Sequence, residues 1–440
     1  MKKNITIFCI IFLLLSATLM LQIPTNDFIW GYGFSYNISQ GLIPYKDFNM
    51  IVSPIYNILF AFPMLIFGNY VLPFILLHIF FYSLILTMAY QKIGKKVLWI
   101  ILLFLPQNTA FGYNTFITTL ILLILLIIGS KIKNKNLLIG LIISFITMTK
   151  HNVGLILIFI YFLTSKNKKK SMLYVSIFII ITFSYLILTN SFMDYINICF
   201  LGIKNFCTNF HTDKFTLILS LIILYYLTKK YIKTKDIKIL YLLASSILLF
   251  PLIEINHLLT ILIPITYYIL ENEKNIIINR IIIIFIITLE TTYLITNYSN
   301  KIPKIEKENN LFLYTIVTNE TTNYLKKYSE YIQTIDGNLY LFINNAYLIK
   351  LYNNETTNFY DLINKGNLGQ NENKYINKIK EKCKKEKCTF ILDNAFYQKE
   401  IKTNQLSINF KNFVLNNYKY IETLPSNDRI YTNNIDKLKR

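Results

Sequence analysis

Residues 1–300 of this 440-residue chain form a succession of Ile-, Leu- and Phe-rich runs, many of which approach the length of a membrane-spanning helix. Hydrophobic side chains make up 54% of the sequence and aromatic ones 15%, a composition typical of a polytopic α-helical membrane protein. The opening run resembles a signal peptide, with Lys2 and Lys3 before an apolar core. We interpret it as a retained first helix, because the core continues to Ile23 without a small-x-small cleavage site.

The distribution of basic residues predicts the topology. The formal net charge is +21, but the lysines lie in short clusters between apolar runs, which argues against a nucleic-acid partner. Short loops rich in Lys and Arg remain in the cytoplasm. We therefore expect a cytoplasmic N-terminus and cytoplasmic loops at Lys92–Lys96, Lys131–Lys135, Lys166–Lys170, Lys229–Lys238 and Lys274–Arg280.

This charge pattern predicts about eleven membrane-spanning helices in the cytoplasmic membrane, with the C-terminus outside. Residues 51–68 would break the alternation of charged loops if they crossed, and Pro54 and Pro63 suit an interrupted helix. We expect this segment to lie along the outer surface or to re-enter. The expected spans are roughly 4–23, 70–91, 97–110, 113–130, 137–150, 152–165, 172–189, 215–228, 239–256, 258–270 and 280–297.

The first outer loop, residues 24–54, carries two acids, Asp27 and Asp47. On charge alone, both are compatible with solvated acids at a headgroup surface. Charged residues at membrane depth are tolerated where they line a wet cavity, so we expect an outward-facing cavity roofed by this loop and by residues 190–214. Polar residues at the outer ends of later spans fit such a cavity: Gln107, Asn108, Asn114, Lys150, His151, Asn152, Glu254, Asn256 and His257.

Residues 301–440 contain no apolar run of membrane length and are predicted to form a small extracytoplasmic α/β domain, so that the membrane domain ends near residue 300. The predicted helices lie near 318–333, 371–386 and 405–417, and the predicted strands near 338–343, 388–393, 418–424 and 428–432. Either Cys199 and Cys207 or Cys383 and Cys388 can form a disulfide in an oxidising compartment. Structural thiols are favoured over a zinc site. The cofactor is left open: a divalent metal is compatible with the sequence, but no feature of the sequence supports one.

The front of the chain carries an ordered set of motifs: Asp27 soon after the first span, GLIPYKDF at 41–48, Pro54 and LIFGN at 65–69. Over roughly residues 1–300 the chain resembles the GT-C superfamily of membrane glycosyltransferases, which includes protein O-mannosyltransferases and aminoarabinose transferases of lipid A. The TKHNVG stretch at 149–154 also resembles a later part of that pattern. Many members place Glu after the first acid, where this chain has Phe28, and this departure weighs against a paired-carboxylate or metal-binding role.

The resemblance implies inverting transfer of a sugar from a polyprenyl-phosphate or polyprenyl-diphosphate donor to a protein, lipid or polymer acceptor outside the membrane. The first-loop acid of the family matches Asp27, and the second acid matches Asp47. A carboxylate in a partly desolvated cavity can accept the proton of the acceptor hydroxyl, and we assign this base role to Asp27, with Asp47 in support.

The departing lipid phosphate needs cationic or hydrogen-bonding partners, for which Lys150, His151 and His257 are the candidates. Lys150 is equally compatible with a lysine that snorkels to headgroups, and His257 with a packed histidine. Candidates for contacts with the sugar or prenyl chain are Trp30, Tyr32, Tyr36 and Tyr45, although Trp and Tyr are also common in interfacial belts.

Two other classes of protein share parts of this pattern. A flippase or transporter of lipid-linked saccharides would also have an outward cavity, but the sequence lacks the internal repeats common in transporters. An O-antigen ligase or polymerase would depend on arginines in a large outer loop, whereas the membrane part here has only Arg280.

Overall fold

The computed structural model describes residues 2–19, 26–104, 111–201, 212–250, 253–272, 283–284, 287–288, 303–307, 311–335, 337–343, 345–356, 372–392, 408–424 and 428–433. The chain forms two compact units, each assembled from separate stretches. The first contains Met1–Tyr32, Ser53–Tyr185 and Asn209–Asn319, and the second contains Gly33–Val52, Leu186–Thr208 and Glu320–Arg440.

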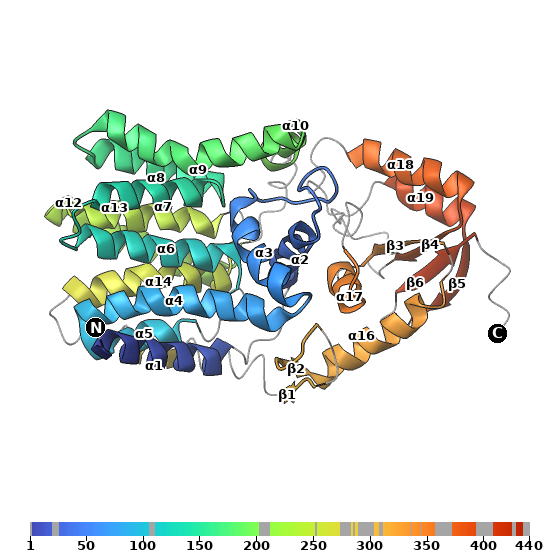
Figure 1. Ribbon diagram of the computed structural model, residues 1–440, viewed down its shortest axis with the longest axis horizontal. Coiled ribbons are helices and arrows are strands. Elements are labelled where there is room, and N and C mark those ends of the chain that lie inside the picture. Colours follow the sequence, from blue (N-terminus) through green and yellow to red (C-terminus); the bar gives the residue numbers. More distant parts are fainter. Residues whose placement is uncertain are drawn as a thin grey trace. The chain divides into compact units, whose positions relative to one another are not determined.

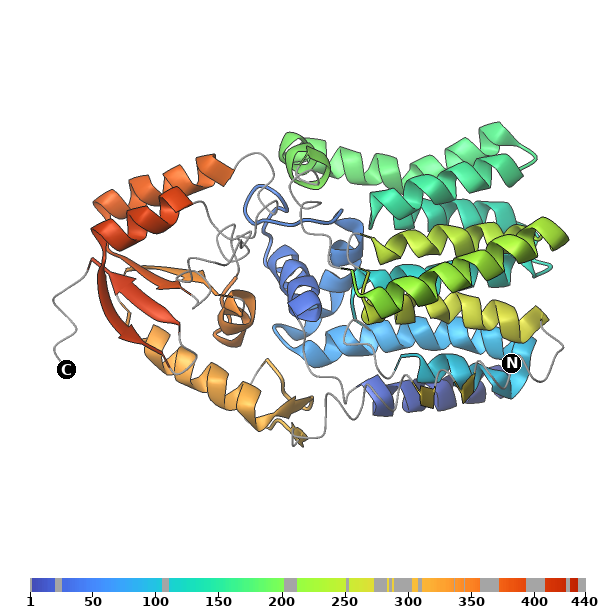
Figure 2. The ribbon, with the colours of Figure 1, turned by 180° about the vertical axis from the view of Figure 1, so that it is seen from behind.

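The first unit is a bundle of helices that lie alongside one another (Figure 1, Figure 2). Helix α6 packs against α4, α7, α13 and α14, and α1 packs against α4. A short antiparallel pair, β1 (Pro303–Ile305) and β2 (Ile316–Thr318), also belongs to this unit. Helix α2 (Asn26–Ser39) crosses the boundary of the units, and the other helices are α1 (Lys2–Leu19), α3 (Ile55–Phe67), α4 (Val71–Ile93), η1 (Gly94–Lys96), α5 (Val97–Leu102), α6 (Tyr113–Ile128), α7 (Lys135–Thr147), α8 (His151–Thr164), α9 (Lys168–Leu188), α12 (Lys214–Thr234), α13 (Ile237–Ser245), η3 (Ser246–Leu249) and α14 (Ile255–Asn272).

Three helical stretches of the described chain are long and apolar enough to cross a membrane: Val71–Leu102, Lys168–Leu188 and Lys214–Thr234. The first includes α4 and α5, and α4 ends at Gly94, where φ is +60°. Shorter apolar helices of 10–17 residues, such as Ile55–Phe67, Tyr113–Ile128 and His151–Thr164, fall short of the roughly 20 residues that cross hydrocarbon. The outer faces of α8, α9 and α12 expose large apolar side chains, as lipid contact requires, including Leu155, Phe159, Leu163, Leu173, Ile180, Leu188, Ile218, Leu221 and Ile222.

Helices occupy the first ten segments that the sequence predicts as spans, whereas most of 280–297 lies outside the described residues. The prediction of a mostly helical chain with a small sheet is confirmed, and three of its helices are long and apolar enough to cross a membrane. Two helices lie where the sequence indicates surface segments. Helix α2 forms part of the expected 24–54 loop, and α3, with Pro63 inside it, has 13 residues and is too short to span on its own.

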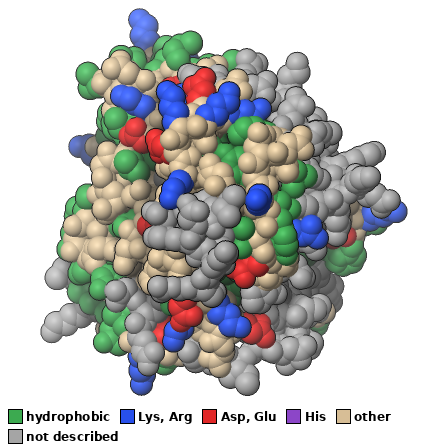
Figure 3. Space-filling model, turned by 90° about the vertical axis from the view of Figure 1, so that its right-hand side faces the viewer, with side chains coloured by type: hydrophobic (Ala, Val, Ile, Leu, Met, Phe, Trp, Pro, Cys, Tyr) green, Lys and Arg blue, Asp and Glu red, His purple; other side chains and the backbone are tan. Residues whose placement is uncertain are grey.

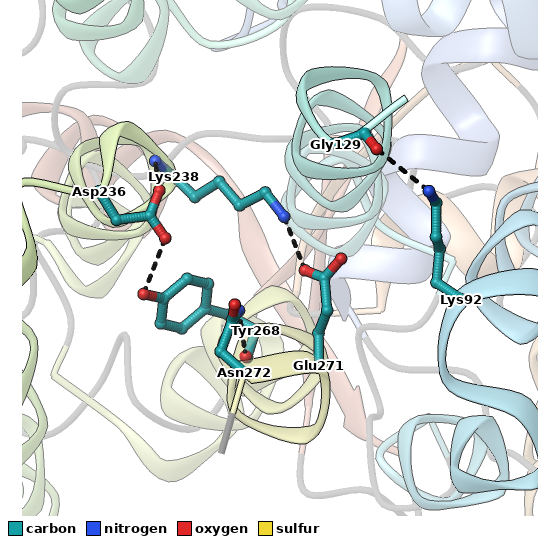
Figure 4. A network of polar contacts seen from close by, with 7 residues as sticks. All are labelled: Lys92, Gly129, Asp236, Lys238, Tyr268, Glu271 and Asn272. Carbon is teal, nitrogen blue, oxygen red and sulfur yellow. Dashed lines mark hydrogen bonds and ion pairs between the residues drawn. The ribbon is translucent and has the colours of Figure 1, made fainter. Parts of the chain in front are cut away.

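The lysine clusters within the described residues, at 92–96, 131–135, 166–170 and 229–238, lie at one end of the helical unit, which we call the lysine end (Figure 1). Figure 4 shows a network there that joins α4, α6, α13 and α14. Lys238 Nζ lies 2.7 Å from Glu271 Oε2, and both side chains are largely buried. Lys92 Nζ donates to the Gly129 carbonyl at 3.1 Å, and Tyr268 Oη donates to Asp236 Oδ2 at 2.9 Å.

Asp236 also caps α13 by accepting a hydrogen bond from the Lys238 amide. The loop after α6 contains Lys131–Lys135, and Tyr161 Oη near the end of α8 donates to the Asn136 carbonyl at the start of α7. These contacts bring the ends of six helices together: α4, α6, α7, α8, α13 and α14. An ion pair excluded from water leaves a costly charge if one partner is removed, so it holds these ends in register.

The second unit is built on a four-stranded sheet with the order β3-β4-β6-β5. Strands β3 and β4 pair in parallel, and β6 pairs antiparallel to both β4 and β5. Figures 1 and 2 show α18 and α19 on one side of the sheet and α16 on the other. The elements are α10 (Phe192–Tyr195), η2 (Ile196–Leu201), α16 (Asn319–Ile332), β3 (Asn338–Phe342), α17 (Ala346–Tyr352), α18 (Glu372–Lys385), β4 (Cys388–Leu392), α19 (Ile408–Asn417), β5 (Lys419–Thr423) and β6 (Arg429–Thr432).

The core and the surface of this unit differ in the way expected of a water-exposed domain. Phe390 on β4 stacks between neighbours on β3, with ring centroids 5.3 Å from Tyr340 and 6.1 Å from Phe342. A disulfide joins Cys383 at the end of α18 to Cys388 at the start of β4. The surface in view in Figure 3 has lysines and acidic residues close together, as expected for contact with water.

We expect Glu271→Gln to lower the free energy of unfolding by about 1–3 kcal/mol, because it leaves the Lys238 ammonium without its carboxylate in a site that is 12% exposed. Thermal unfolding of the purified protein in detergent measures this change. The matched control is Lys382→Gln, since the Lys382–Glu386 pair is 4.0 Å long and half exposed and should contribute under about 0.5 kcal/mol. Equal effects of the two substitutions would contradict the role given to the network.

Candidate functional site

The end of the helical unit opposite the lysine end is shaped by the turn between α7 and α8. Lys150 ends this turn in an extended conformation, and its amide donates to the Ile146 carbonyl at 2.8 Å. Gly154 follows one turn into α8, where a Cβ would overlap the Cα and side chain of Thr147. The TKHNVG sequence therefore folds tightly because glycine lets the two helix backbones approach, and this fixes where the Lys150 side chain begins.

The Lys150 ammonium lies against the start of α6. Its Nζ donates to Asn114 Oδ1 at 3.1 Å and lies 5.5 Å from the centroid of the Tyr113 ring. Asn114 is buried, whereas Lys150 is half-buried. We call Lys150, Asn114 and Tyr113 the Lys150 cluster. An ammonium group in this position can form a charge-assisted hydrogen bond with an anion.

His257 lies at the same level of the bundle as the Lys150 cluster. Gly129 at the end of α6 and Glu271 at the end of α14 meet at the lysine end through Lys238. At 1.5 Å per residue, Asn114 lies roughly 20 Å before Gly129 along α6, and His257 lies roughly 20 Å before Glu271 along α14. Asn114 and His257 are therefore at the same distance from the lysine end. His257 is buried, and His151, next to Lys150, is half-buried at the start of α8.

Asn256 Oδ1, one residue before His257, and Ser246 Oγ, in η3 after α13, are buried and have no hydrogen-bond partner within the described part of the chain. Ser246 lies in η3, which packs against both α8 and α14. Buried polar atoms are normally paired with protein or water, so these two add hydrogen-bonding capacity to the polar end. Gln107 and Asn108, which the sequence places at the same end, lie outside the described residues.

An apolar cavity of about 860 Å³ lies within the same unit, between α1, α3, α4, α6, α7 and α9. Its walls include Phe8, Phe81, Phe116, Phe145 and Phe178, and Asn4 and Thr87 are its polar lining residues. Other lining residues, Ile5, Phe80 and Leu84, are exposed, so the cavity opens on the apolar side of the bundle. Such a space suits a hydrocarbon chain and excludes a polar ligand.

The cavity wall reaches the Lys150 cluster through a series of aromatic rings. Phe116 lines the cavity two residues after Asn114 on α6. The rings of Phe116 and Tyr113 both contact the Tyr56 ring, at centroid distances of 5.7 Å and 6.4 Å. The apolar space and the cationic group are therefore neighbours, one helical turn apart.

A buried tyrosine–histidine pair supports this region, and the sequence analysis did not identify it. Tyr56 Oη lies 2.7 Å from His78 Nε2 and donates to the Phe111 carbonyl at 2.8 Å. His78 Nδ1 lies 2.9 Å from the Phe74 carbonyl. The pair ties α3 and α4 to the residues that precede α6. A histidine within the apolar sequence FILLHIFF was the available signal, because ionisable residues inside membrane helices are costly and usually have a specific role.

The sequence-predicted residues near the first outer helix lie in the first unit. Asp27 is in α2, and its side chain lies outside the described part. Trp30 is half-buried, and Tyr32 is buried with its hydroxyl donating to Asn69 Oδ1 at 2.7 Å. Phe28 contacts the rings of Phe74 and Phe111. A carboxylate at that position would be surrounded by aromatic rings.

The other predicted residues, Asp47, Tyr36 and Tyr45, lie in the second unit. Asp47 is exposed, and its Oδ2 accepts a hydrogen bond from the Ile43 amide at 2.7 Å. Tyr45 is fully buried, with its hydroxyl donating to the Val52 carbonyl. Tyr36 is buried, and burial raises the pKa of its hydroxyl. The hydroxyl donates to the Asn354 carbonyl at 3.4 Å, so both tyrosines have structural contacts.

The described residues contain no group of three or more His, Cys, Asp or Glu side chains that could hold a metal ion. The structure thus brings Lys150, Asn114 and the apolar cavity together in one unit, with His257 at the same level. Comparisons with protein families, with curated proteins and with solved structures find no match to this chain.

Proposed function

We propose that this protein is a membrane glycosyltransferase that moves a sugar from a polyprenyl-phosphate donor to an acceptor on the outer face of the cytoplasmic membrane, with inversion. The observation that carries the proposal is the apolar cavity beside the Lys150 cluster. An amphiphile with a hydrocarbon chain and an anionic head matches both parts. A polyprenyl phosphate has this chemistry, and its phosphate is the leaving group of sugar transfer.

In this proposal the Lys150 ammonium binds the donor phosphate and stabilises the charge that develops on it during transfer. His151 and His257 contribute from the same level of the bundle, and Asn256 and Ser246 offer further hydrogen-bonding atoms. Asp27 acts as the base that takes the proton of the acceptor hydroxyl, and Asp47 supports it. The two carboxylates are assigned from the motif order in the sequence.

The same proposal includes the topology: about eleven spans, a cytoplasmic N-terminus and lysine end, and a C-terminal domain outside. The gathering of lysine clusters at one end of the helical unit supports it, since short basic loops stay in the cytoplasm. The disulfide between Cys383 and Cys388 supports it independently. Structural disulfides persist in oxidising compartments and are rare in the cytoplasm.

Transport of a lipid-linked saccharide is the second candidate, because the cavity also extends toward Asn4 at the lysine end. A transporter moves the intact lipid across the membrane, whereas a transferase separates the sugar from its lipid phosphate. Release of free polyprenyl phosphate therefore distinguishes the two functions.

We expect Lys150→Met to raise the Kd for polyprenyl phosphate by about tenfold or more, because a charge-assisted contact to phosphate contributes about 1.5–3 kcal/mol. Methionine keeps most of the apolar stem and removes the charge. Native mass spectrometry of the purified protein with graded polyprenyl phosphate measures the affinity. Lys214→Met, at an exposed lysine that begins α12, is the matched control and should leave the Kd within about twofold. Equal losses in the two variants would contradict a specific role for Lys150.

We expect Asp27→Asn to lower turnover by about 10²- to 10⁴-fold, because loss of a positioned base has this cost, while donor binding stays intact. The assay incubates purified protein with a panel of polyprenyl-phosphate sugars and follows free polyprenyl phosphate by mass spectrometry. Asp47→Asn should reduce turnover less, and Asp194→Asn in α10 is the control. Turnover by Asp27→Asn at the rate of the wild type would reject the base assignment.

We expect Cys383 and Cys388 to resist maleimide labelling in intact cells until a reductant is added. The disulfide consumes both thiols, and an outer location gives the reductant access to them. A membrane-impermeant maleimide with a gel-shift tag, applied before and after an impermeant reductant, measures this. A cysteine introduced at Lys168 in the predicted cytoplasmic loop should stay unlabelled. Labelling at position 168 with protection of both native cysteines after reduction would reverse the proposed topology.

A further inference from the structure

The segment that carries Asp47 is packed on two sides within the second unit. On one side, the Tyr45 ring lies 5.2 Å from the Tyr195 ring at the end of α10, and Cys199 Sγ lies 3.8 Å from the Met50 carbonyl. Cys199 belongs to η2, which is a π-helix, a form often found at functional sites. Lys46 Nζ also donates to the Thr189 carbonyl at 3.4 Å.

On the other side, the same segment contacts α17 of the C-terminal sheet domain. Tyr347 is fully buried, and its hydroxyl donates to the Asn49 carbonyl at 3.4 Å, two residues after Asp47. Its ring meets the Phe34 ring edge-on, with centroids 5.7 Å apart. Gly33 lies so close that a Cβ there would be 2.6 Å from Tyr347 Cδ1. Only glycine fits against this ring without a shift of the helix or the ring.

The turn that bears Asp47 has an unusual backbone. Tyr45 adopts φ +68°, a left-handed conformation that is uncommon for a large side chain, and its ring is completely buried. The Asp47 carboxylate closes the turn by accepting the Ile43 amide. A strained turn persists only where surrounding contacts hold it, and α17 supplies part of those contacts.

We propose that α17 of the C-terminal domain is the positioning element for the Asp47 turn, and that Tyr347, packed on Gly33, is its principal residue. The C-terminal domain then has a direct role in the reaction. Helix α17, whose residues Ala346–Leu351 are all buried, sets the conformation of the turn that carries Asp47. This inference rests on the proposed function for its catalytic consequence, and on the packing alone for its structural part.

Two readouts test it in the full-length protein. The first is turnover in the lipid-phosphate release assay. Tyr347→Ala should lower kcat by about tenfold or more while the donor KM changes less than about twofold, because small misplacements of a reacting group have large effects on rate. Tyr347→Phe keeps the ring and should stay within about threefold of the wild type. Gly33→Ala should resemble Tyr347→Ala, but should have little further effect when added to it, because the clashing ring is then gone.

The second readout needs no activity. Cys199 is a native buried thiol that touches the Asp47 segment, and in a Cys9→Ser, Cys207→Ser background it is the one thiol outside the Cys383–Cys388 disulfide. If the Asp47 segment is released, the rate at which maleimide labels Cys199 should rise by about tenfold in Tyr347→Ala and in Gly33→Ala. Tyr347→Phe should label at the rate of the parent protein.

The outcomes separate the two proposals. Unchanged Cys199 labelling in both Tyr347→Ala and Gly33→Ala overturns the positioning role. Faster labelling with unchanged kcat overturns its catalytic consequence. A wild-type protein that binds donor but releases no lipid phosphate overturns the proposed function, and the labelling experiment then decides the structural coupling by itself. If the effects of Gly33→Ala and Tyr347→Ala on kcat add in the double variant, this result also contradicts a direct contact between Gly33 and the Tyr347 ring.

Discussion

Charge that cannot enter hydrocarbon is the constraint on which the helical unit depends. The described lysine clusters gather at one end, where Lys238 and Asp236 of α13 join Glu271 and Tyr268 of α14. The Lys238–Glu271 pair satisfies two charges that would otherwise be buried alone. The helices between the two ends are consequently apolar on their outward faces and can form a cavity that contains almost no polar group.

The opposite end is polar in a different way. Lys150 has a neutral amide and an aromatic ring as its identified neighbours, and the Tyr56–His78 pair beneath them fixes the segment that begins α6. The lysine end holds the bundle together, whereas the Lys150 end includes a buried polar atom, Asn256 Oδ1, that has no hydrogen-bond partner in the described part of the chain. This asymmetry is the physical basis for proposing a lipid-phosphate substrate.

Much of the fold could be predicted because hydrophobic runs and charge clusters are local signals. Helices α6, α8 and α9 begin and end within a few residues of the expected spans, and β3 and β4 agree equally well with the predicted strands. Membrane crossing is harder to predict, since many apolar helices are shorter than a bilayer. The sequence left open which cysteines pair, because spacing alone does not show whether Cys383 and Cys388 approach each other in space.

The candidate site was less predictable, for a physical reason. Lys150 and His257 stand out locally as polar residues at the ends of apolar runs. The contacts that define the candidate site join residues far apart in the chain, such as Lys150 with Asn114 and Tyr56 with His78. Helix α17 was missed because AYLIKLY has no distinct local pattern. Its importance arises from its burial and its contacts with residues 33–52, which the sequence does not reveal.

The central claim is that the apolar cavity holds the hydrocarbon chain of a phosphate-bearing lipid whose head lies at Lys150. The most direct measurement is photo-crosslinking with a polyprenyl phosphate that carries a diazirine near its first isoprene units, followed by peptide mapping. The account predicts crosslinks to the cavity walls around Phe81, Phe116 and Phe145, and loss of these crosslinks in Lys150→Met. Crosslinks confined to the exposed faces of α9 and α12, and unaffected by Lys150→Met, would contradict it.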